Sequence, residues 1–165
     1  MVVRNSIGIG AVRLRLIFFA FLTTSHIALA QEREWILNAS EKEAFLVFGV
    51  PDTDDVGLSF WCEIGKNKTS LFINGAPLQL KQNQSTNIKV TIDDKVFVVK
   101  AKAAVDRQGR RPTLEGQLRN DDPLLKAAQN GSVLKVTVLT QTTTYPLIDA
   151  DFAGLQRTCA GDAVN

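Results

Sequence analysis

The sequence predicts a mainly β protein, an antiparallel sandwich or partly open barrel with two short helices, one of them at the C-terminus. Short apolar runs with the two-residue period of strands recur along the chain, and turn-forming residues separate several of them. Two other short segments have the capping residues and the spacing of helices. The 165 residues suffice for one domain, and a hydrophobic content of 45% is ordinary for a globular chain.

Residues 1–30 have the pattern of a cleaved secretory signal peptide. Three arginines and no acidic residue accompany an apolar run at residues 16–22, and Ala28-Leu29-Ala30 ends the segment. The apolar run is far shorter than the roughly 20 residues that span a bilayer. We therefore predict cleavage before Gln31, a single β-rich domain at residues 31–165, no membrane span in that domain, and a periplasmic or secreted location.

The first part of this domain contains seven strand-like runs, which share alternating apolar positions or β-branched and aromatic residues. They are Trp35–Ala39, Ala44–Val50, Val56–Ile64, Ser70–Ile73, Pro77–Leu80, Asn87–Ile92 and Val96–Val105. Asn74-Gly75 predicts a two-residue hairpin, and Asp93-Asp94 is a weaker signal of the same kind. Residues 96–99 are apolar on both faces, which predicts a central place in the sheet.

A short strand at Leu114–Leu118 and a final strand at Val133–Thr140 flank a compact helix at Asp122–Gly131. Asp122 is a favourable N-cap, and the proline after it suits the first helical position. Gly131 is suited to a left-handed exit from the helix.

The two cysteines are predicted to form a structural disulfide. Alternation in the strand at residues 58–64 places Cys62 on its apolar face. Phe152, Leu155 and Cys159 fall on one stripe of a C-terminal helix from about residue 149 to Cys159. Both sulfurs thus point inward, and export would place them in an oxidising compartment. The alternative, a redox-active thiol, lacks a Cys-x-x-Cys spacing.

Charge and histidine content exclude several function classes once the leader is removed. The whole chain has 19 basic and 17 acidic residues and one histidine, with a net charge of +2. The leader contains three of the arginines and His26, so the mature domain has a net charge of −1 and no histidine. We expect no nucleic-acid partner, no Ser-His-Asp or Cys-His catalysis, no histidine zinc site and no cofactor.

An acidic turn is the nearest approach to a metal motif. Asp52, Asp54 and Glu63 match positions one, three and twelve of a calcium-binding loop. Val56 occupies the fifth position, where an oxygen ligand is needed, and a strand follows in place of a helix. We therefore predict no metal site.

Two features are candidate partner contacts. Arg107, Arg110 and Arg111 form a basic loop that would hold an acidic partner, the alternative being an ordinary solvated loop. Trp61 lies on the polar face of its strand, where it either anchors a partner or is covered by a helix.

Carboxylates are the only acid–base groups left for catalysis. Adjacent pairs occur at Asp54/Asp55, Asp93/Asp94 and Asp121/Asp122, all at predicted turns, where turn formation and helix capping are their ordinary roles. We therefore predict no catalytic residue. The leading hypothesis is a non-enzymatic module of the cell envelope that binds a protein or a glycan. The alternatives are a small carboxylate-based hydrolase of envelope glycans and a purely structural envelope protein.

Six segments resemble, in their order, a pattern of small exported bacterial envelope proteins. They are Leu58–Cys62, Lys68–Ile73, Val90–Asp93, Asp122–Gly131, Leu134–Val138 and residues 145–159, which together span about 100 residues. The pattern resembles that of the VasI-type accessory proteins associated with type VI secretion and of similar periplasmic domains. The resemblance implies a periplasmic all-β accessory domain with paired cysteines and no catalytic set.

Overall fold

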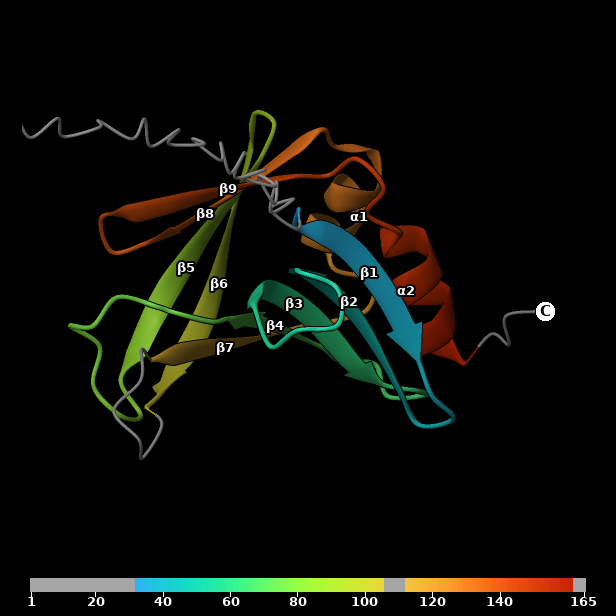
Figure 1. The fold of residues 1–165 in the computed structure, drawn as a ribbon, viewed down its shortest axis with the longest axis horizontal. Helices are drawn as coiled ribbons and strands as arrows, with labels where there is room; N and C mark the ends of the chain where they lie inside the picture. The colour runs from blue at the N-terminus through green and yellow to red at the C-terminus, as the bar shows by residue number, and fades with distance from the viewer. Residues whose placement is uncertain (1–31, 106–111, 162–165) are drawn as a thin grey trace, which may run out of the picture. The chain divides into compact units, whose positions relative to one another are not determined.

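Nine antiparallel strands form one sheet that curls into a half-barrel in the computed structural model, which describes residues 32–105 and 112–161 (Figure 1). The strands are β1 (Glu34–Ala39), β2 (Glu43–Gly49), β3 (Val56–Glu63), β4 (Thr69–Ile73), β5 (Ser85–Ile92), β6 (Lys95–Ala104), β7 (Thr113–Leu118), β8 (Val133–Val138) and β9 (Gln141–Pro146), and the helices are α1 (Pro123–Asn130) and α2 (Phe152–Ala160). The strand order is β1-β2-β3-β4-β7-β6-β5-β8-β9. The predicted fold class is confirmed in its partly open barrel form.

The two ends of the sheet approach each other. The indole Nε1 of Trp35 in β1 donates a hydrogen bond to the carbonyl oxygen of Pro146 in β9. The rings of Phe48 in β2 and Tyr145 in β9 meet edge to face, with their centroids 5.3 Å apart. These contacts link the first strands to the last one and give the sheet an inner face that can be buried.

Small residues allow the sheet to bend sharply between β6 and β7. Ala101, Ala103 and Gly116 are buried on the inner face, and Ala101 and Gly116 are register partners. A Cβ atom on Gly116 would lie 2.6 Å from Cγ1 of Val99, which is closer than real contacts allow. A glycine at a tight bend of a sheet is typical of barrel corners.

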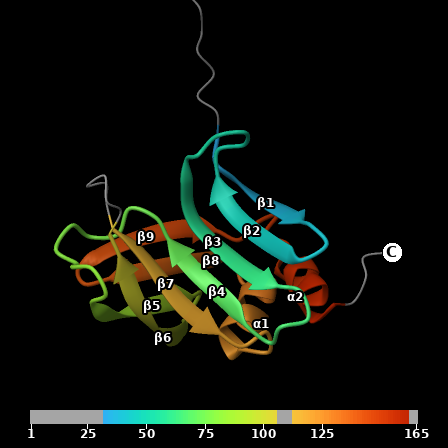
Figure 2. The same cartoon turned by 90° about the horizontal axis from the view of Figure 1, so that it is seen from below.

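Helix α2 packs against the inner face near β1 and β2, and both helices lie at the same end of the curled sheet (Figures 1 and 2). Phe152 is fully buried, and its ring centroid lies 4.9 Å from that of Phe60 and 5.6 Å from that of Trp35. The Asp151 carboxylate caps the helix by accepting a hydrogen bond from the Gly154 amide at 2.7 Å.

The predicted disulfide between Cys62 and Cys159 is confirmed. The two Cα atoms are 5.8 Å apart, and 97 positions separate the residues in the sequence. Both cysteines are buried, so the bond ties α2 to β3 inside the core. A buried disulfide is consistent with an oxidising compartment outside the cytoplasm.

The predicted leader at residues 1–30 lies outside the described residues. Among the residues that are described, no helix is long and apolar enough to cross a membrane.

Two expectations about strands are wrong. One concerns residues 77–80, between β4 and β5, and the other concerns residues 96–99, within β6. Residues 77–80 form a turn, in which the Leu80 amide donates to the Pro77 carbonyl at 3.1 Å, instead of a strand. Residues 96–99 are not central, because β7 pairs with β6 only along Ala101–Ala104. Val96 and Val98 are consequently 56% and 64% exposed on the outer face.

Three turn and edge features also differ from expectation. Asn74-Gly75 does not close a hairpin, since β4 pairs next with β7, about 40 residues later in the chain. Strand β9 was not expected, for two reasons. Its Thr-rich first four residues are exposed and show no apolar period. The tight turn before it is made by Leu139, which has φ of 53°. Gly131 has an extended backbone in place of a left-handed one.

We predict that loss of the disulfide lowers the free energy of unfolding by about 4–5 kcal/mol, because the bond closes a loop of nearly 100 residues. Urea unfolding of the Cys62→Ala/Cys159→Ala double variant, compared with the oxidised protein, measures this loss. Intact mass after alkylation without reductant is the control, and the oxidised protein should take up no label. An unchanged unfolding midpoint, or two labelled thiols in the native protein, would contradict the prediction.

We also predict that Tyr145 makes stability fall with rising pH in the alkaline range. Burial raises the pKa of Tyr145 above its usual value of about 10. Above that pH the unfolded state loses the phenolic proton while the folded state keeps it, so the free energy of unfolding decreases. Urea unfolding between pH 9 and about 11 should show a smaller decrease for Tyr145→Phe than for the wild type. Equal slopes in the two proteins would refute this.

Candidate functional site

Three aromatic side chains lie next to one another on the outer face of β2, β3 and β4. Phe45 and Trp61 are register partners with ring centroids 6.3 Å apart, and Trp61 and Phe72 lie 6.4 Å apart. Strand alternation explains their position, because Phe60 and Cys62 on either side of Trp61 point into the core. All three are half-buried, and we call them the outer aromatic row.

A hollow of about 510 Å³ opens beside Trp61. It is lined by Trp61, Glu63, Lys66, Asn67, Lys68, Ser70, Glu115 and Gln117, and we call it the Trp61 hollow. The hydroxyl of Ser70, a buried residue, donates a hydrogen bond to Oε1 of Glu115 at 3.0 Å. The indole Nε1 of Trp61 is itself buried and has no hydrogen-bond partner among the described residues. Buried indole N–H groups nearly always have one, so the Trp61 donor is an exception among the described residues.

A wider groove of about 980 Å³ adjoins the hollow on the outer face of β5, β6 and β7. Glu115 and Gln117 line both spaces, so the hollow and the groove are neighbours on the outer face. We call this space the β5–β7 groove, and polar and cationic side chains dominate its lining. The lining side chains that project outward from the strands are Ser85, Asn87, Lys100, Lys102, Glu115 and Gln117.

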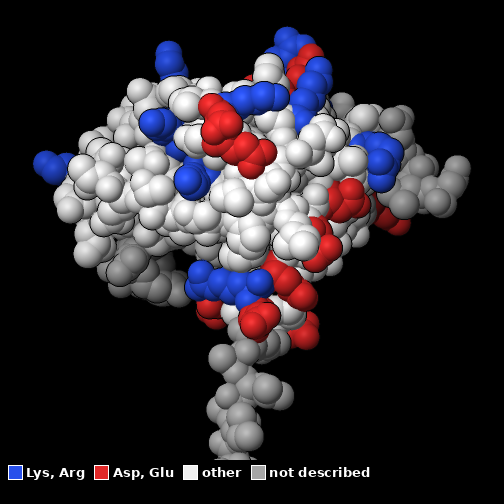
Figure 3. All heavy atoms as spheres, turned by 90° about the horizontal axis from the view of Figure 1, so that it is seen from above, with Lys and Arg blue, Asp and Glu red and all other residues white. Residues whose placement is uncertain are grey.

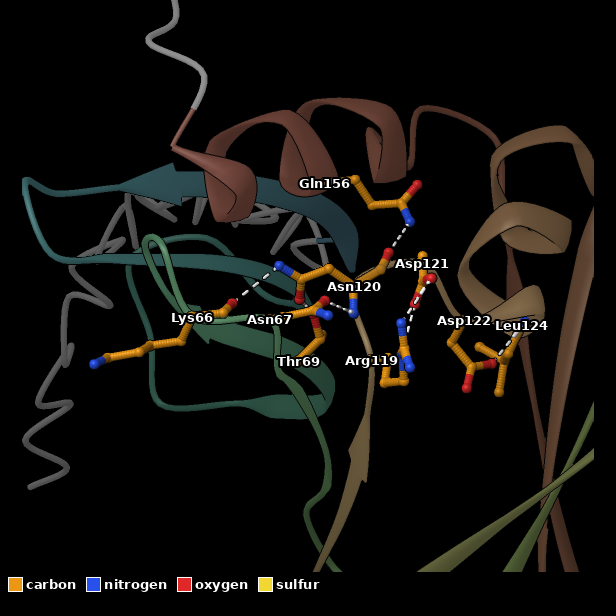
Figure 4. Close-up of polar contacts among 9 residues, drawn as sticks. All are labelled: Lys66, Asn67, Thr69, Arg119, Asn120, Asp121, Asp122, Leu124 and Gln156. Atoms are coloured by element: carbon orange, nitrogen blue, oxygen red, sulfur yellow. Dashed lines mark hydrogen bonds and ion pairs between the residues drawn. The ribbon is translucent and has the colours of Figure 1, made fainter.

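Asn120 fixes one wall of the Trp61 hollow (Figure 4). Its side chain accepts a hydrogen bond from the Thr69 hydroxyl at 2.7 Å and donates one to the Lys66 carbonyl at 3.0 Å. Its backbone amide donates to Oδ1 of Asn67 at 3.2 Å, and its carbonyl accepts from Nε2 of Gln156 in α2. The turn between β3 and β4 is therefore attached to the end of β7 and to α2.

The residues next to Asn120 have structural roles of their own (Figure 4). Arg119 and Asp121 form a two-point contact at 2.9 and 3.1 Å. The hydrogen bond from Arg119 lowers the pKa of the Asp121 carboxyl. Asp122 caps α1 by accepting a hydrogen bond from the Leu124 amide at 2.9 Å.

The other carboxylate pairs also make structural contacts. Asp55 forms an ion pair with Arg33 at 2.6 Å. Oδ1 of Asp93 accepts two hydrogen bonds, from the backbone amides of Ser132 and Val133, each with an N–O distance of 3.2 Å. One aspartate of each of these two pairs, Asp55 and Asp93, therefore makes a structural contact.

The structure separates the residues of the acidic turn. Asp52 and Asp54 lie before β3, while Glu63 is its last residue, so the eight-residue strand stands between them. Within residues 32–105 and 112–161, no group of three acidic or cysteine side chains is placed to hold a metal ion.

Of the two candidate partner contacts, only Trp61 can be placed. It points outward, as alternation predicts, and the helices do not cover it, because α1 and α2 lie at the inner opening of the sheet. The basic loop with Arg107, Arg110 and Arg111 lies outside the described residues.

Sequence reasoning missed the remaining walls of the hollow. Ser70, Glu115 and Gln117 come from β4 and β7, whose pairing joins segments about 45 residues apart. No local pattern signals that pairing. The sequence predicted only a short strand at Leu114–Leu118, and in β7 Glu115 and Gln117 alternate with buried residues and therefore share the outer face.

These features define a disulfide-bonded half-barrel domain with an aromatic and polar surface on its outer face. Searches of protein-family models, curated proteins and solved structures find no match to this chain. The relation to VasI-type accessory proteins therefore stays a prediction.

We predict that Asn120→Ala lowers the free energy of unfolding by about 1–3 kcal/mol, because the Thr69 hydroxyl is left buried without its acceptor. Amide hydrogen exchange in the turn at residues 66–69 should become faster at the same time. Asn87→Ala is the matched control, since Asn87 is exposed on β5 and its loss should be nearly neutral. Equal stability of the two variants would contradict the assigned role of Asn120.

Proposed function

We propose that this protein is an exported, non-enzymatic binding module of the cell envelope that holds its ligand in the Trp61 hollow. The single observation that carries the proposal is the row of outward aromatic rings, centred on Trp61, at the edge of a hollow lined by polar side chains. The leader pattern and the buried disulfide support the envelope location.

The surface around Trp61 combines the two properties that a binding site needs. The outer aromatic row provides a flat apolar area, and aromatic side chains contribute much of the binding energy of protein surfaces. Ser70, Glu115 and Gln117 provide hydrogen-bonding groups beside it. The contacts of Asn120 hold one wall in place, so binding costs little additional ordering.

Binding is favoured over hydrolysis by the contact that one carboxylate of the hollow makes. Glu115 accepts the hydrogen bond from the Ser70 hydroxyl, which gives this carboxylate a structural role. Glycosidases need two carboxyl groups about 5–10 Å apart on either side of the bond that they cleave. The other glutamate of the hollow, Glu63, lies two strands across and four residues along from Glu115.

The same surface would serve an accessory domain of the VasI type. A purely structural envelope protein would need no such hollow, and no observation favours that alternative.

We predict that Trp61→Ala weakens ligand binding about 30-fold, as truncation of a central aromatic contact of about 2 kcal/mol would. Isothermal titration calorimetry with soluble peptidoglycan fragments and with other envelope oligosaccharides provides the measurement. Trp61→Phe keeps a ring but loses the N–H donor, so its affinity should lie between those of Trp61→Ala and the wild type.

Ile148→Ala is the control, because Ile148 is also a large exposed apolar residue, at 73%, and does not line the hollow. Its affinity should equal that of the wild type. A folded Trp61→Ala protein with wild-type affinity for the ligand would refute the assignment of the site.

A further inference from the structure

The outer face of β5, β6 and β8 carries four exposed lysines and no carboxylate at its outward strand positions. The lysines are Lys89 on β5, Lys100 and Lys102 on β6, and Lys135 on β8. Each alternates with apolar residues that point into the core, so all four project from the same face.

Strand register arranges these lysines in a row. Lys89 is paired with Val98 on one side and with Thr137 on the other. Lys100 and Lys135 each lie two residues from those partners, which makes them diagonal neighbours of Lys89 at about 7–8 Å. Lys102 follows Lys100 on the same face after about 7 Å. We call these four residues the lysine row.

No ion pair in the described part of the chain includes a lysine of this row. Ion pairs within residues 32–105 and 112–161 are confined to Arg33–Asp55 and Arg119–Asp121. One carboxylate lies beside the row at its Lys102 end, because Glu115 on the adjacent strand is the register partner of Lys102, and it also accepts the hydrogen bond from Ser70.

The lysine row leads into the site already described. Lys100 and Lys102 line the β5–β7 groove, which borders the Trp61 hollow at Glu115 and Gln117. A chain-like ligand that fills the hollow and continues along the groove would therefore pass over cations separated by about 7 Å.

We propose that the ligand is an acidic polysaccharide chain, whose sugar rings contact the outer aromatic row and whose anionic groups lie along the lysine row. This inference rests on the proposed function and adds the chemical class of the ligand. Lysine attracts carboxylate or phosphate groups as a point charge, without requiring a fixed geometry. The hydroxyl and amide groups of Ser85 and Asn87 beside the row suit sugar hydroxyl groups.

A polysaccharide fits this surface better than a nucleic acid or a bilayer. The domain as a whole is close to neutral, with both basic and acidic side chains on the face seen in Figure 3, whereas nucleic-acid binding relies on a general positive excess. A bilayer needs protruding apolar groups surrounded by cations, while Lys100 and Lys102 line a groove.

The test uses the mature protein and a triple variant, Lys89→Gln/Lys100→Gln/Lys102→Gln. Polygalacturonate is the acidic probe, dextran the neutral one, and calorimetry at two salt concentrations gives the affinities. The triple variant should bind polygalacturonate about tenfold more weakly, since three exposed charge contacts are lost. Its affinity should also depend less on salt than that of the wild type.

The matched control is Lys42→Gln/Lys81→Gln/Lys126→Gln, which removes the same charge from exposed lysines outside the row and the groove. It should bind polygalacturonate within about twofold of the wild type, since scattered surface charges contribute little. Equal loss in both triple variants would overturn the inference, because bulk charge would then explain binding. Stronger binding to duplex DNA or to phosphatidylglycerol vesicles than to polygalacturonate would overturn it as well.

The test also separates this inference from the proposed function. If Trp61→Ala abolishes binding of an oligosaccharide and the lysine-row variant does not, the site stands and the acidic ligand is refuted. If the lysine-row variant loses binding of polygalacturonate and Trp61→Ala does not, the Trp61 hollow is refuted as the site.

Discussion

The attachment of α2 to the inner face of the sheet is the constraint on which the rest of this structure depends. A half-barrel leaves part of its inner face open, and apolar side chains there would meet water. Helix α2 covers this opening with Phe152, which contacts Phe60 and Trp35. The disulfide between Cys62 and Cys159 stabilises this packing of the helix, because it lowers the conformational entropy of the unfolded chain.

This arrangement leaves the outer face uncovered. Both helices lie at the inner opening, so none is left to cover the outer aromatic row. Cys62 and Trp61 are adjacent on β3, and strand alternation sends their side chains to opposite faces. The disulfide that anchors the core therefore also holds the backbone of the residue on which the candidate site depends. A rigid aromatic platform loses little conformational entropy when it binds a ligand.

Local pattern was sufficient for features that depend on a single element. Alternation placed Cys62 inside and Trp61 outside, and helical spacing placed Cys159 inside, so the disulfide was predictable. Strand β9 was not, because its first four residues are polar and exposed and only Tyr145 is buried, so the strand has no apolar period. The turn before it uses Leu139 in a conformation that turn rules assign to glycine or asparagine.

The candidate site depended on pairings that no local pattern contains. Ser70 and Glu115 meet only because β4 pairs with β7, and the intervening β5–β6 hairpin gives no sign of this. The lysine row combines residues of three strands, β5, β6 and β8, and each lysine is an ordinary outward residue of its strand. Register is set by the global curl of the sheet, which small residues such as Gly116 permit.

Net charge and local charge therefore support different conclusions about partners. A mature charge near −1 argues against general attraction to polyanions, since such attraction acts through the field of the whole molecule. Screening limits that field to about 8–10 Å at physiological salt, which is close to the spacing within the lysine row. Only a ligand that lies directly along the row feels its charge at full strength. A nearly neutral domain with a segregated cationic row is thus consistent with the proposed acidic chain, which would lie along that row, rather than with a general attraction to polyanions.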